Sequence, residues 1–161
     1  AFALDRLWNV VRTNAVAKMF PGMDVELPLD AIELFYAPGP LRDSILNWDD
    51  VASSVRSRLR REVLHAGDDP VLQTRLDRLE ELIADVEVSP NPPDLDQPVL
   101  TTMMKVGDQV ITTIGTVVQF TTARDVLLQE LRLELLFPAD QATEEFFRAL
   151  ANCGEQGTLR Q

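Results

Sequence analysis

The chain has 161 residues, of which 45% are apolar and 25% charged, so it can bury one hydrophobic core and is too apolar to be wholly disordered. A formal net charge of −11 excludes a surface built to hold phosphate backbones or anionic lipid headgroups, and no apolar run is long enough to span a membrane. One cysteine and one histidine exclude an internal disulfide and leave few soft metal ligands. We therefore expect a cytoplasmic chain with one domain and no nucleic-acid or membrane partner of its own.

The first twenty residues predict a hairpin followed by a helix. Two short apolar stretches, rich in aromatic and β-branched residues, predict strands over about 1–4 and 8–13. Asn14 follows the second strand, and its side-chain oxygen can accept from the first free N–H groups of a helix over about 15–20. A Pro-Gly dipeptide then ends this helix.

The middle of the chain predicts helices only. A short apolar patch predicts a helix over about 29–36. Two longer amphipathic helices are predicted over about 48–65 and 70–86, because apolar residues recur there every three or four positions. Asn47 and Asp69 are the expected N-caps of these two helices.

After a proline-rich stretch at 89–98, which we expect to be a linker, the apolar period changes to two. This period predicts strands over about 99–106, 109–121 and 127–137. The last strand carries leucines and a phenylalanine on one side and charged residues on the other. We expect the apolar side to face the core.

The chain is expected to close with a helix over about 141–152, capped by Asp140 and stopped by Gly154. Residues 1–154 would then form a single domain, and 155–161 a C-terminal tail. Antiparallel strands with a cluster of helices on one face and a C-terminal helix make the predicted fold class α+β.

Two segments carry a resemblance to a known family. The order of elements, with Asn14 opening a helix in "VVRTNAVAKMF" (10–20), resembles the PAS fold, a five-stranded antiparallel sheet that faces a helical bundle across a small cavity. "DVLLQELRLELLFPAD" (125–140) is similar to the closing strand of the ligand-binding domain of MmyB-like bacterial transcription regulators of the XRE helix-turn-helix class. Leu127 stands where that family's pattern has threonine.

The resemblance implies a sensor of a small apolar ligand, for which a fatty acid is one candidate. It also implies a fused DNA-binding domain that lies outside this chain, and we expect a homodimer. Ligand occupancy would act by shifting the population between two arrangements of the sheet and helices. Asn14 is the one residue carried over from the family pattern, and its role there is structural.

A ligand would lie between the inner face of the sheet and the amphipathic helices, so residues expected to point there are candidate binding residues. The apolar candidates are Trp8, Val10, Met19, Phe35, Leu59, Met104, Ile114, Val118, Phe120 and Leu133. The polar candidates are Arg12, whose guanidinium fits a carboxylate, and the strand threonines Thr102, Thr112 and Thr116. The competing interpretation is plain core packing for the apolar set and ordinary strand formation for the threonines.

Other functions find less support. The arginines at 56, 58, 60 and 61 spread around their helix, which favours a solvated face or an ion-pair seam over a nucleic-acid patch. His65 lies beside a turn and is expected to be exposed instead of acting as a general base. We expect no catalytic residue, no metal site, no cofactor and no enzyme activity. The rival hypothesis is a dimerisation or protein-interaction module of the same fold, with a filled core and no ligand.

Overall fold

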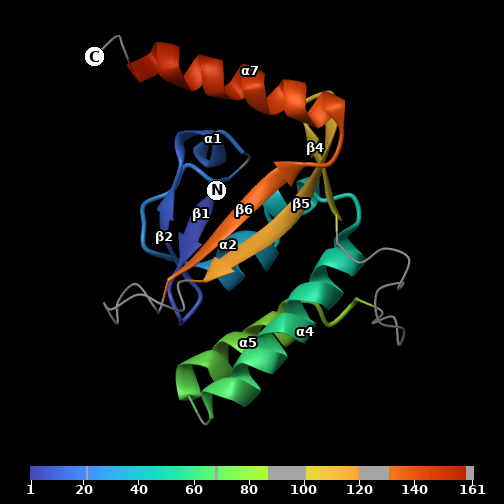
Figure 1. Ribbon diagram of the computed structural model, residues 1–161. Coiled ribbons are helices and arrows are strands. Elements are labelled where there is room, and N and C mark those ends of the chain that lie inside the picture. Colours follow the sequence, from blue (N-terminus) through green and yellow to red (C-terminus); the bar gives the residue numbers. More distant parts are fainter. Residues whose placement is uncertain (21, 68, 87–100, 120–130, 159–161) are drawn as a thin grey trace.

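The computed structural model describes residues 1–20, 22–67, 69–86, 101–119 and 131–158, and for 153–158 only the helical backbone. Six antiparallel strands form one curled sheet, a half-barrel, in the order β3-β2-β1-β6-β5-β4. Helices cover its inner side, and the C-terminal helix lies across one end (Figure 1). The fold class is therefore α+β, as predicted, but the sheet has six strands where five were expected.

The N-terminal hairpin is confirmed. Strands β1 (Phe2–Leu4) and β2 (Asn9–Thr13) pair antiparallel, and helix α1 (Ala15–Lys18) follows. Asn14 caps this helix as predicted, because its Oδ1 accepts from the Ala17 N–H at 2.9 Å. The helix ends two residues before the predicted boundary.

The extra strand comes from a segment that was predicted to be helical. Residues 29–36 split into strand β3 (Leu29–Asp30) and helix α2 (Ala31–Tyr36). Asn9 pairs with Asp30 and Val10 with Leu29, so the two residues of β3 extend the sheet beyond β2. A strand this short leaves no periodic pattern in the sequence.

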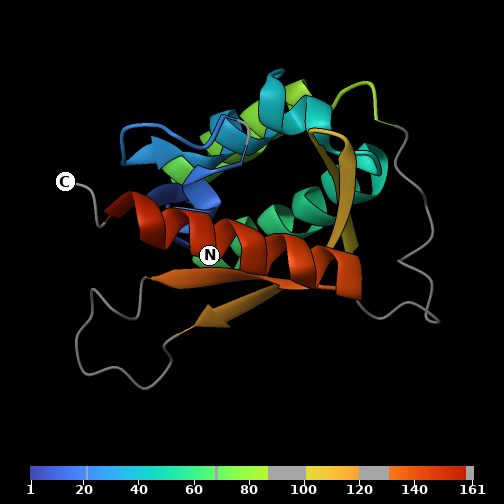
Figure 2. The same ribbon diagram turned by 90° about the horizontal axis from the view of Figure 1, so that it is seen from above.

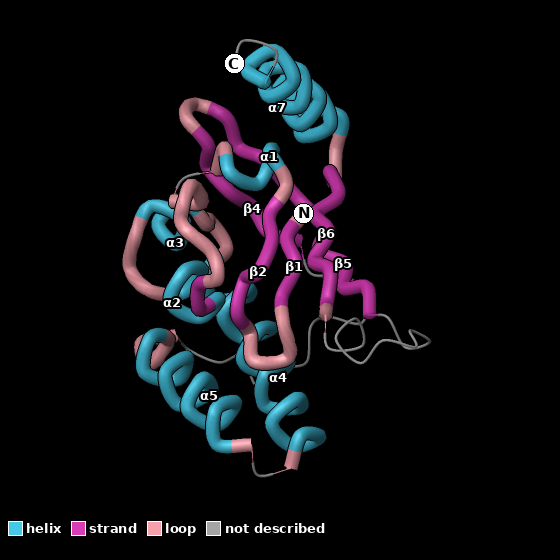
Figure 3. The backbone as a smooth tube through the Cα atoms, turned by 90° about the vertical axis from the view of Figure 1, so that its left-hand side faces the viewer, coloured by secondary structure: helices cyan, strands magenta, loops and turns pink. Residues whose placement is uncertain are grey.

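Helix α3 (Pro40–Ser44) was not predicted, because it is only five residues long and begins with a proline. Proline suits that position, since its missing N–H would have no partner there in any case. The long helices α4 (Trp48–Ala66) and α5 (Pro70–Leu82) are confirmed and lie side by side below the β1–β2 hairpin (Figure 3). Helix α5 ends four residues earlier than expected.

The two expected caps of these helices behave differently. Asp69 Oδ1 accepts from the N–H groups of Val71 at 2.9 Å and Leu72 at 3.4 Å, as a cap does. Asn47 makes no capping hydrogen bond in α4, which corrects the prediction. Its side chain instead accepts from the Met103 N–H at 2.9 Å and donates to the Thr101 carbonyl at 2.7 Å, and so it binds the free edge of strand β4 (Thr101–Val106).

The C-terminal strand β5 (Gln109–Gln119) pairs over residues 113–119 with the whole of β6 (Arg132–Pro138), and over 109–114 with β4. The predicted linker at 89–98 and the ends of all three predicted strands, at 99–100, 120–121 and 127–130, lie outside the described residues. Helix α7 (Gln141–Thr158) begins after the predicted Asp140 cap and then passes through Gly154, so the stop predicted there is wrong. A glycine inside a helix costs only about 1 kcal/mol, which its neighbours can offset.

Two hydrophobic clusters occupy the inner side of the sheet. The first cluster packs α2, α4 and α5 against the β1–β2 hairpin, and includes Leu4, Trp8, Val10, Ile32, Leu59, Leu79 and Ile83. The second lies between α1, α3, α7 and the β4–β5 hairpin, and includes Phe20, Met23, Leu41, Met104 and Ile111, with Phe146 and Phe147 packed against it. Seen from above, α7 runs beside β5 and β6, which it contacts (Figure 2).

Candidate functional site

A cavity of about 520 Å³ lies between the inner face of the sheet and the helices, on the side of the second cluster. Its walls come from β1, α1 to α4, β4 to β6 and α7 and from the segments beside them, but not from β2, β3 or α5. The apolar lining residues are Phe2, Val16, Ala17, Phe20, Met23, Phe35, Leu41, Ile45, Val51, Val55, Met104, Val117, Leu136 and Phe147. This size and lining are typical of a small-molecule site.

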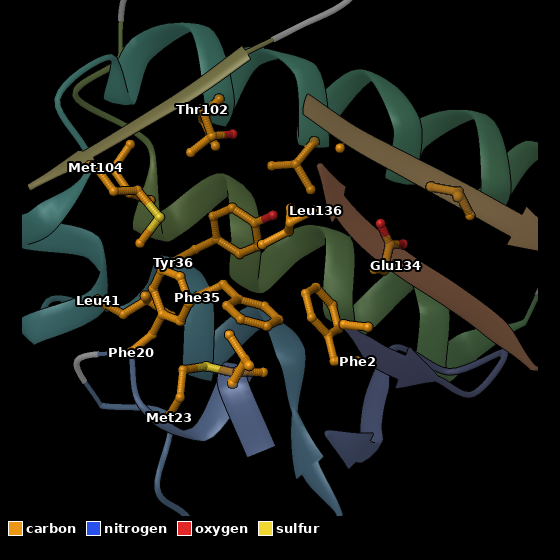
Figure 4. A pocket seen from close by; sticks show the side chains of 18 of the residues that line it. Phe2, Phe20, Met23, Phe35, Tyr36, Leu41, Thr102, Met104, Glu134 and Leu136 are labelled. Atoms are coloured by element: carbon orange, nitrogen blue, oxygen red, sulfur yellow. The ribbon is translucent and has the colours of Figure 1, made fainter. Parts of the chain in front are cut away.

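Aromatic rings and methionines shape the apolar wall (Figure 4). Phe2 of β1 and Phe35 of α2 lie with their ring centroids 4.9 Å apart. Phe20 meets Phe147 of α7 edge-on at 6.1 Å, which attaches the C-terminal helix to the segment after α1. Met104 is buried while its neighbour Met103 is exposed, so only one of the adjacent pair points inward, as expected.

One region of the lining is polar, and three elements supply it. Tyr36 comes from α2, Arg58 from α4 and Glu134 from β6. Arg58 Nη2 lies 2.6 Å from Glu134 Oε1, and Arg58 Nε donates to Glu62 Oε1 at 3.1 Å. Burial alone would lower the pKa of Arg58, but the Glu134 and Glu62 carboxylates raise it overall, so the guanidinium stays charged. Burial raises the pKa of Tyr36, which keeps its hydroxyl protonated.

The ion pairs continue from the cavity into the first cluster. Glu62 accepts from Trp8 Nε1 at 2.6 Å and is paired with Arg132, whose Nη2 also donates to the backbone carbonyl of Asp5 at 3.2 Å. Burial alone would raise the pKa of Glu62, but hydrogen bonds from Arg132 and Trp8 lower it overall. A chain of alternating charges, Glu134–Arg58–Glu62–Arg132, therefore runs beneath the sheet from the cavity to the β1–β2 turn.

Three of the predicted binding residues line the cavity: Phe35, Met104 and Thr102. Trp8, Val10 and Leu59 do point inward, but they are packed in the first cluster and do not reach the cavity. The competing interpretation of core packing therefore applies to these three.

The inner and outer faces of the C-terminal strands were assigned the wrong way round. Gly115 pairs with Leu136 and Val117 with Glu134, and all four line the cavity. Ile114, Val118 and Leu133 alternate with these residues along the two strands and therefore lie on the outer face. The prediction failed because Arg132 and Glu134 on the inner face are neutralised by partners on α4. Phe120 lies outside the described residues.

The remaining candidates, three polar residues and Met19, do not line the cavity. Arg12 is exposed on the outer face, opposite Ala3. Met19 is also exposed, just beyond the last residue of α1. Thr112 and Thr116 share the outer face of β5, away from the cavity. The Thr112 N–H donates to Thr143 Oγ1 at 2.9 Å.

Sequence reasoning missed the polar lining residues Tyr36, Arg58 and Glu134. Arg58 and Glu62 are one helical turn apart, and Arg132 and Glu134 alternate on a strand, so both pairs were visible as local patterns. Their joining depends on the contact between α4 and β6, which no local pattern reveals. The aromatic pair Phe146–Phe147 of α7 was likewise not singled out, because its neighbours come from distant parts of the chain.

Within the described ranges, no group of three or more His, Cys, Asp or Glu residues could hold a metal ion. No described helix is both long and apolar enough to cross a membrane. Two arginines of α4 form ion pairs with Glu80 of α5. Arg60 Nη2 lies 2.6 Å from Glu80 Oε1 and Arg56 Nη1 lies 3.9 Å from Glu80 Oε2, which supports the expected ion-pair seam. His65 is exposed, and its Nδ1 lies 2.6 Å from the carbonyl of Arg61.

Comparison with known proteins gives one match. The model of the family described as the MmyB-like transcription regulator ligand binding domain matches residues 1–150. No curated protein and no solved structure shows a significant match to the chain. The matched range includes every residue described above as lining the cavity.

Proposed function

The chain belongs to the family of MmyB-like transcription regulator ligand-binding domains, and on this basis we propose that its cavity binds a small, largely apolar molecule that controls the regulator. The single observation that carries the proposal is the cavity of about 520 Å³ with its predominantly apolar wall. A long-chain, fatty-acid-like molecule is one candidate, since flexible methionine side chains such as Met23 and Met104 can adapt to an alkyl chain.

The proposed regulator carries its DNA-binding part elsewhere, as a fused helix-turn-helix domain of the XRE class. The net charge of −11 is consistent with this division, because this domain's field repels a phosphate backbone. The fold is proposed to be a PAS-like variant with a sixth strand, acting in the cytoplasm. Ligand binding would favour one arrangement of the sheet and helices, and the attached domain would respond to that shift.

The alternative function is a protein-interaction module with a filled core. The cavity favours the sensor, because a well-packed interior leaves few voids larger than a water molecule. A homodimer is compatible with both functions, since helix-turn-helix regulators commonly read two half-sites as a dimer. Sedimentation of the purified protein tests this, and a monomer at all concentrations, with and without ligand, would contradict it.

Gly115 allows a direct test of the sensor. It lines the cavity from β5, and a Cβ built there meets no atom within 4 Å. We expect Gly115→Leu to fold and to occupy part of the cavity, whereas Gly115→Ala leaves most of the space open. Native mass spectrometry should find a small molecule bound to the original protein and to Gly115→Ala, but not to Gly115→Leu.

Thermal unfolding provides the second readout. A ligand that binds only the folded state at 100 times its Kd stabilises it by about 2.7 kcal/mol. We expect fatty acids, fatty alcohols or the co-purifying molecule to raise Tm of the original protein and of Gly115→Ala only. If native mass spectrometry finds no bound molecule on any of the three proteins, and none of these compounds raises Tm, the interaction module would be favoured.

A further inference from the structure

The polar part of the cavity contains charges that already neutralise one another. Arg58 reaches Glu134 at 2.6 Å and Glu62 at 3.1 Å, and its guanidinium carbon lies 4.9 Å from the centroid of the Trp8 ring. Glu62 in turn is paired with Arg132. The two arginines and two glutamates therefore sum to zero charge, and the positive charge of Arg58 is committed to protein carboxylates.

We propose that the cavity selects a ligand whose polar head is uncharged and both donates and accepts hydrogen bonds, such as an alcohol or a primary amide, over a ligand with a carboxylate head. The proposal rests on the sensing function above and specifies the chemistry of its ligand. It concerns the head group that would meet Tyr36, Arg58 and Glu134, while the apolar wall receives the chain.

A carboxylate head would be opposed by the protein carboxylate that faces the same space. Figure 4 shows the Glu134 side chain directed toward the cavity, and the exposed fraction of this side chain is only 12%. Two like charges held close together in a partly dry site repel one another far more than in water. To bind Arg58, a ligand carboxylate would also have to compete with Glu62 and Glu134, which hold it already.

A neutral head finds both of the partners that it needs. A glutamate carboxylate offers about four lone-pair sites, and Arg58 uses only part of this capacity at Glu134. The Tyr36 hydroxyl makes no hydrogen bond within the described residues and is kept protonated by burial, so it remains available as a donor. A ligand hydroxyl can therefore donate to Glu134 while it accepts from Tyr36.

The test compares 1-decanol, decanamide and decanoate, which share a chain length and differ in the head group. Their dissociation constants are measured by displacement of a fluorescent apolar probe at about pH 8, where an alkyl carboxylate is ionised. We expect the alcohol and the amide to bind at least about tenfold more tightly than decanoate, the ratio that corresponds to about 1.4 kcal/mol.

Variants then assign the selectivity to its residues. Glu134→Gln removes the opposing charge and keeps the side-chain shape. The affinity for decanoate relative to that for decanol should therefore rise by about tenfold. Glu144→Gln is the matched control, because Glu144 lies on α7 in an exposed pair with Arg148 and should leave the ratio unchanged. Tyr36→Phe removes only the hydroxyl and should weaken decanol, which tests the donor even if Glu134→Gln does not fold.

The outcomes separate this inference from the sensing function. Tighter binding of decanoate than of decanol by the original protein, or an unchanged ratio in both Glu134→Gln and Tyr36→Phe, would overturn the head-group selectivity alone. Failure of all three compounds to displace the bound probe would overturn the head-group selectivity, whereas a probe that does not bind the protein at all would contradict the sensing function.

Discussion

The inner side of the sheet has a filled half and a hollow half, built on the same six strands. In the filled half, α4 and α5 lie together beneath the β1–β2 hairpin, and Leu59, Leu79 and Ile83 are almost completely buried. In the hollow half, the short helices α1 and α3 and the start of α7 face the β4–β5 hairpin around the cavity. The difference teaches that the paired long helices α4 and α5 fill the space beneath the hairpin, whereas the short helices α1 and α3 leave part of the space beside the β4–β5 hairpin open.

Helix α4 belongs to both halves, and its own residues show the transition. Leu59, toward its C-terminal end, is fully buried in the first cluster. Val51, two turns earlier on the same apolar stripe, lines the cavity instead. Arg58 lies between these regions and joins Glu134 in the cavity to Glu62 in the filled half.

The largest effect is expected from breaking the filled half. Leu59→Ala removes a side chain with no exposed surface and should lower the free energy of unfolding by about 4 kcal/mol, because little can move in to replace it. Urea unfolding followed by circular dichroism measures the change. Leu64→Ala, on the same helix but with 80% of the residue exposed, is the control and should stay within about 0.5 kcal/mol. Similar losses in both variants would mean that α4 is not anchored as described.

A smaller effect is expected from cutting the charge chain that joins the halves. Glu62→Ala leaves Arg132, whose side chain is 9% exposed, without its carboxylate, and should cost about 3 kcal/mol after allowance for partial exposure. Glu80→Ala breaks a more exposed pair with Arg60 and should cost no more than about 1 kcal/mol. Equal losses in the two variants would show that the Glu62 pairs contribute no more than a surface pair.

The same carboxylate predicts a pH dependence. The pKa of Glu62 is lower in the folded state than in the unfolded state, where a glutamate has a pKa of about 4.3. Its contribution to stability is therefore complete above that pH and is lost as the pH falls through the lowered folded-state value, because the unfolded state then binds more protons. Stability measured between about pH 6 and 3 should fall more steeply for the original protein than for Glu62→Ala.

The smallest effect is expected in the hollow half. Leu41→Ala makes the same substitution as Leu59→Ala, but Leu41 already faces the cavity over part of its surface. The loss should lie at the low end of the range for buried leucines, at about 2 kcal/mol, because fewer contacts are removed. The two losses are compared by the same urea titration. A cost for Leu41→Ala as large as that for Leu59→Ala would contradict the distinction between a filled and a hollow half.

Local chemistry made part of this fold predictable from sequence. Asn14 and Asp69 were recognised as caps because their side chains act on N–H groups within three residues. The long helices were recognised because their apolar stripes are complete over several turns. The strand β3 was missed because two residues carry no period, and its pairing depends on β2, which lies about twenty residues away in the printed sequence.

The cavity was less predictable, for a physical reason that Arg132 illustrates. Period-two alternation separates the two faces of a strand, but it does not say which face is buried. Apolar Leu133 and charged Arg132 would normally be assigned to the core and the solvent, yet Arg132 is the buried one. Its partner Glu62 is 70 residues away in sequence, so the deciding interaction is invisible to any local rule.

The contact of Asn47 with β4 affects how the protein behaves in crowded solution. An edge strand with free N–H and C=O groups is a template for strands of other chains, and can begin cross-β aggregation. Asn47 occupies the N–H of Met103 and the carbonyl of Thr101, and the Leu46 N–H donates to the Met103 carbonyl at 2.8 Å. The Asn47 side chain and the Leu46 backbone thus take hydrogen-bonding places at Thr101 and Met103 that an incoming strand would require, which opposes strand addition at this edge.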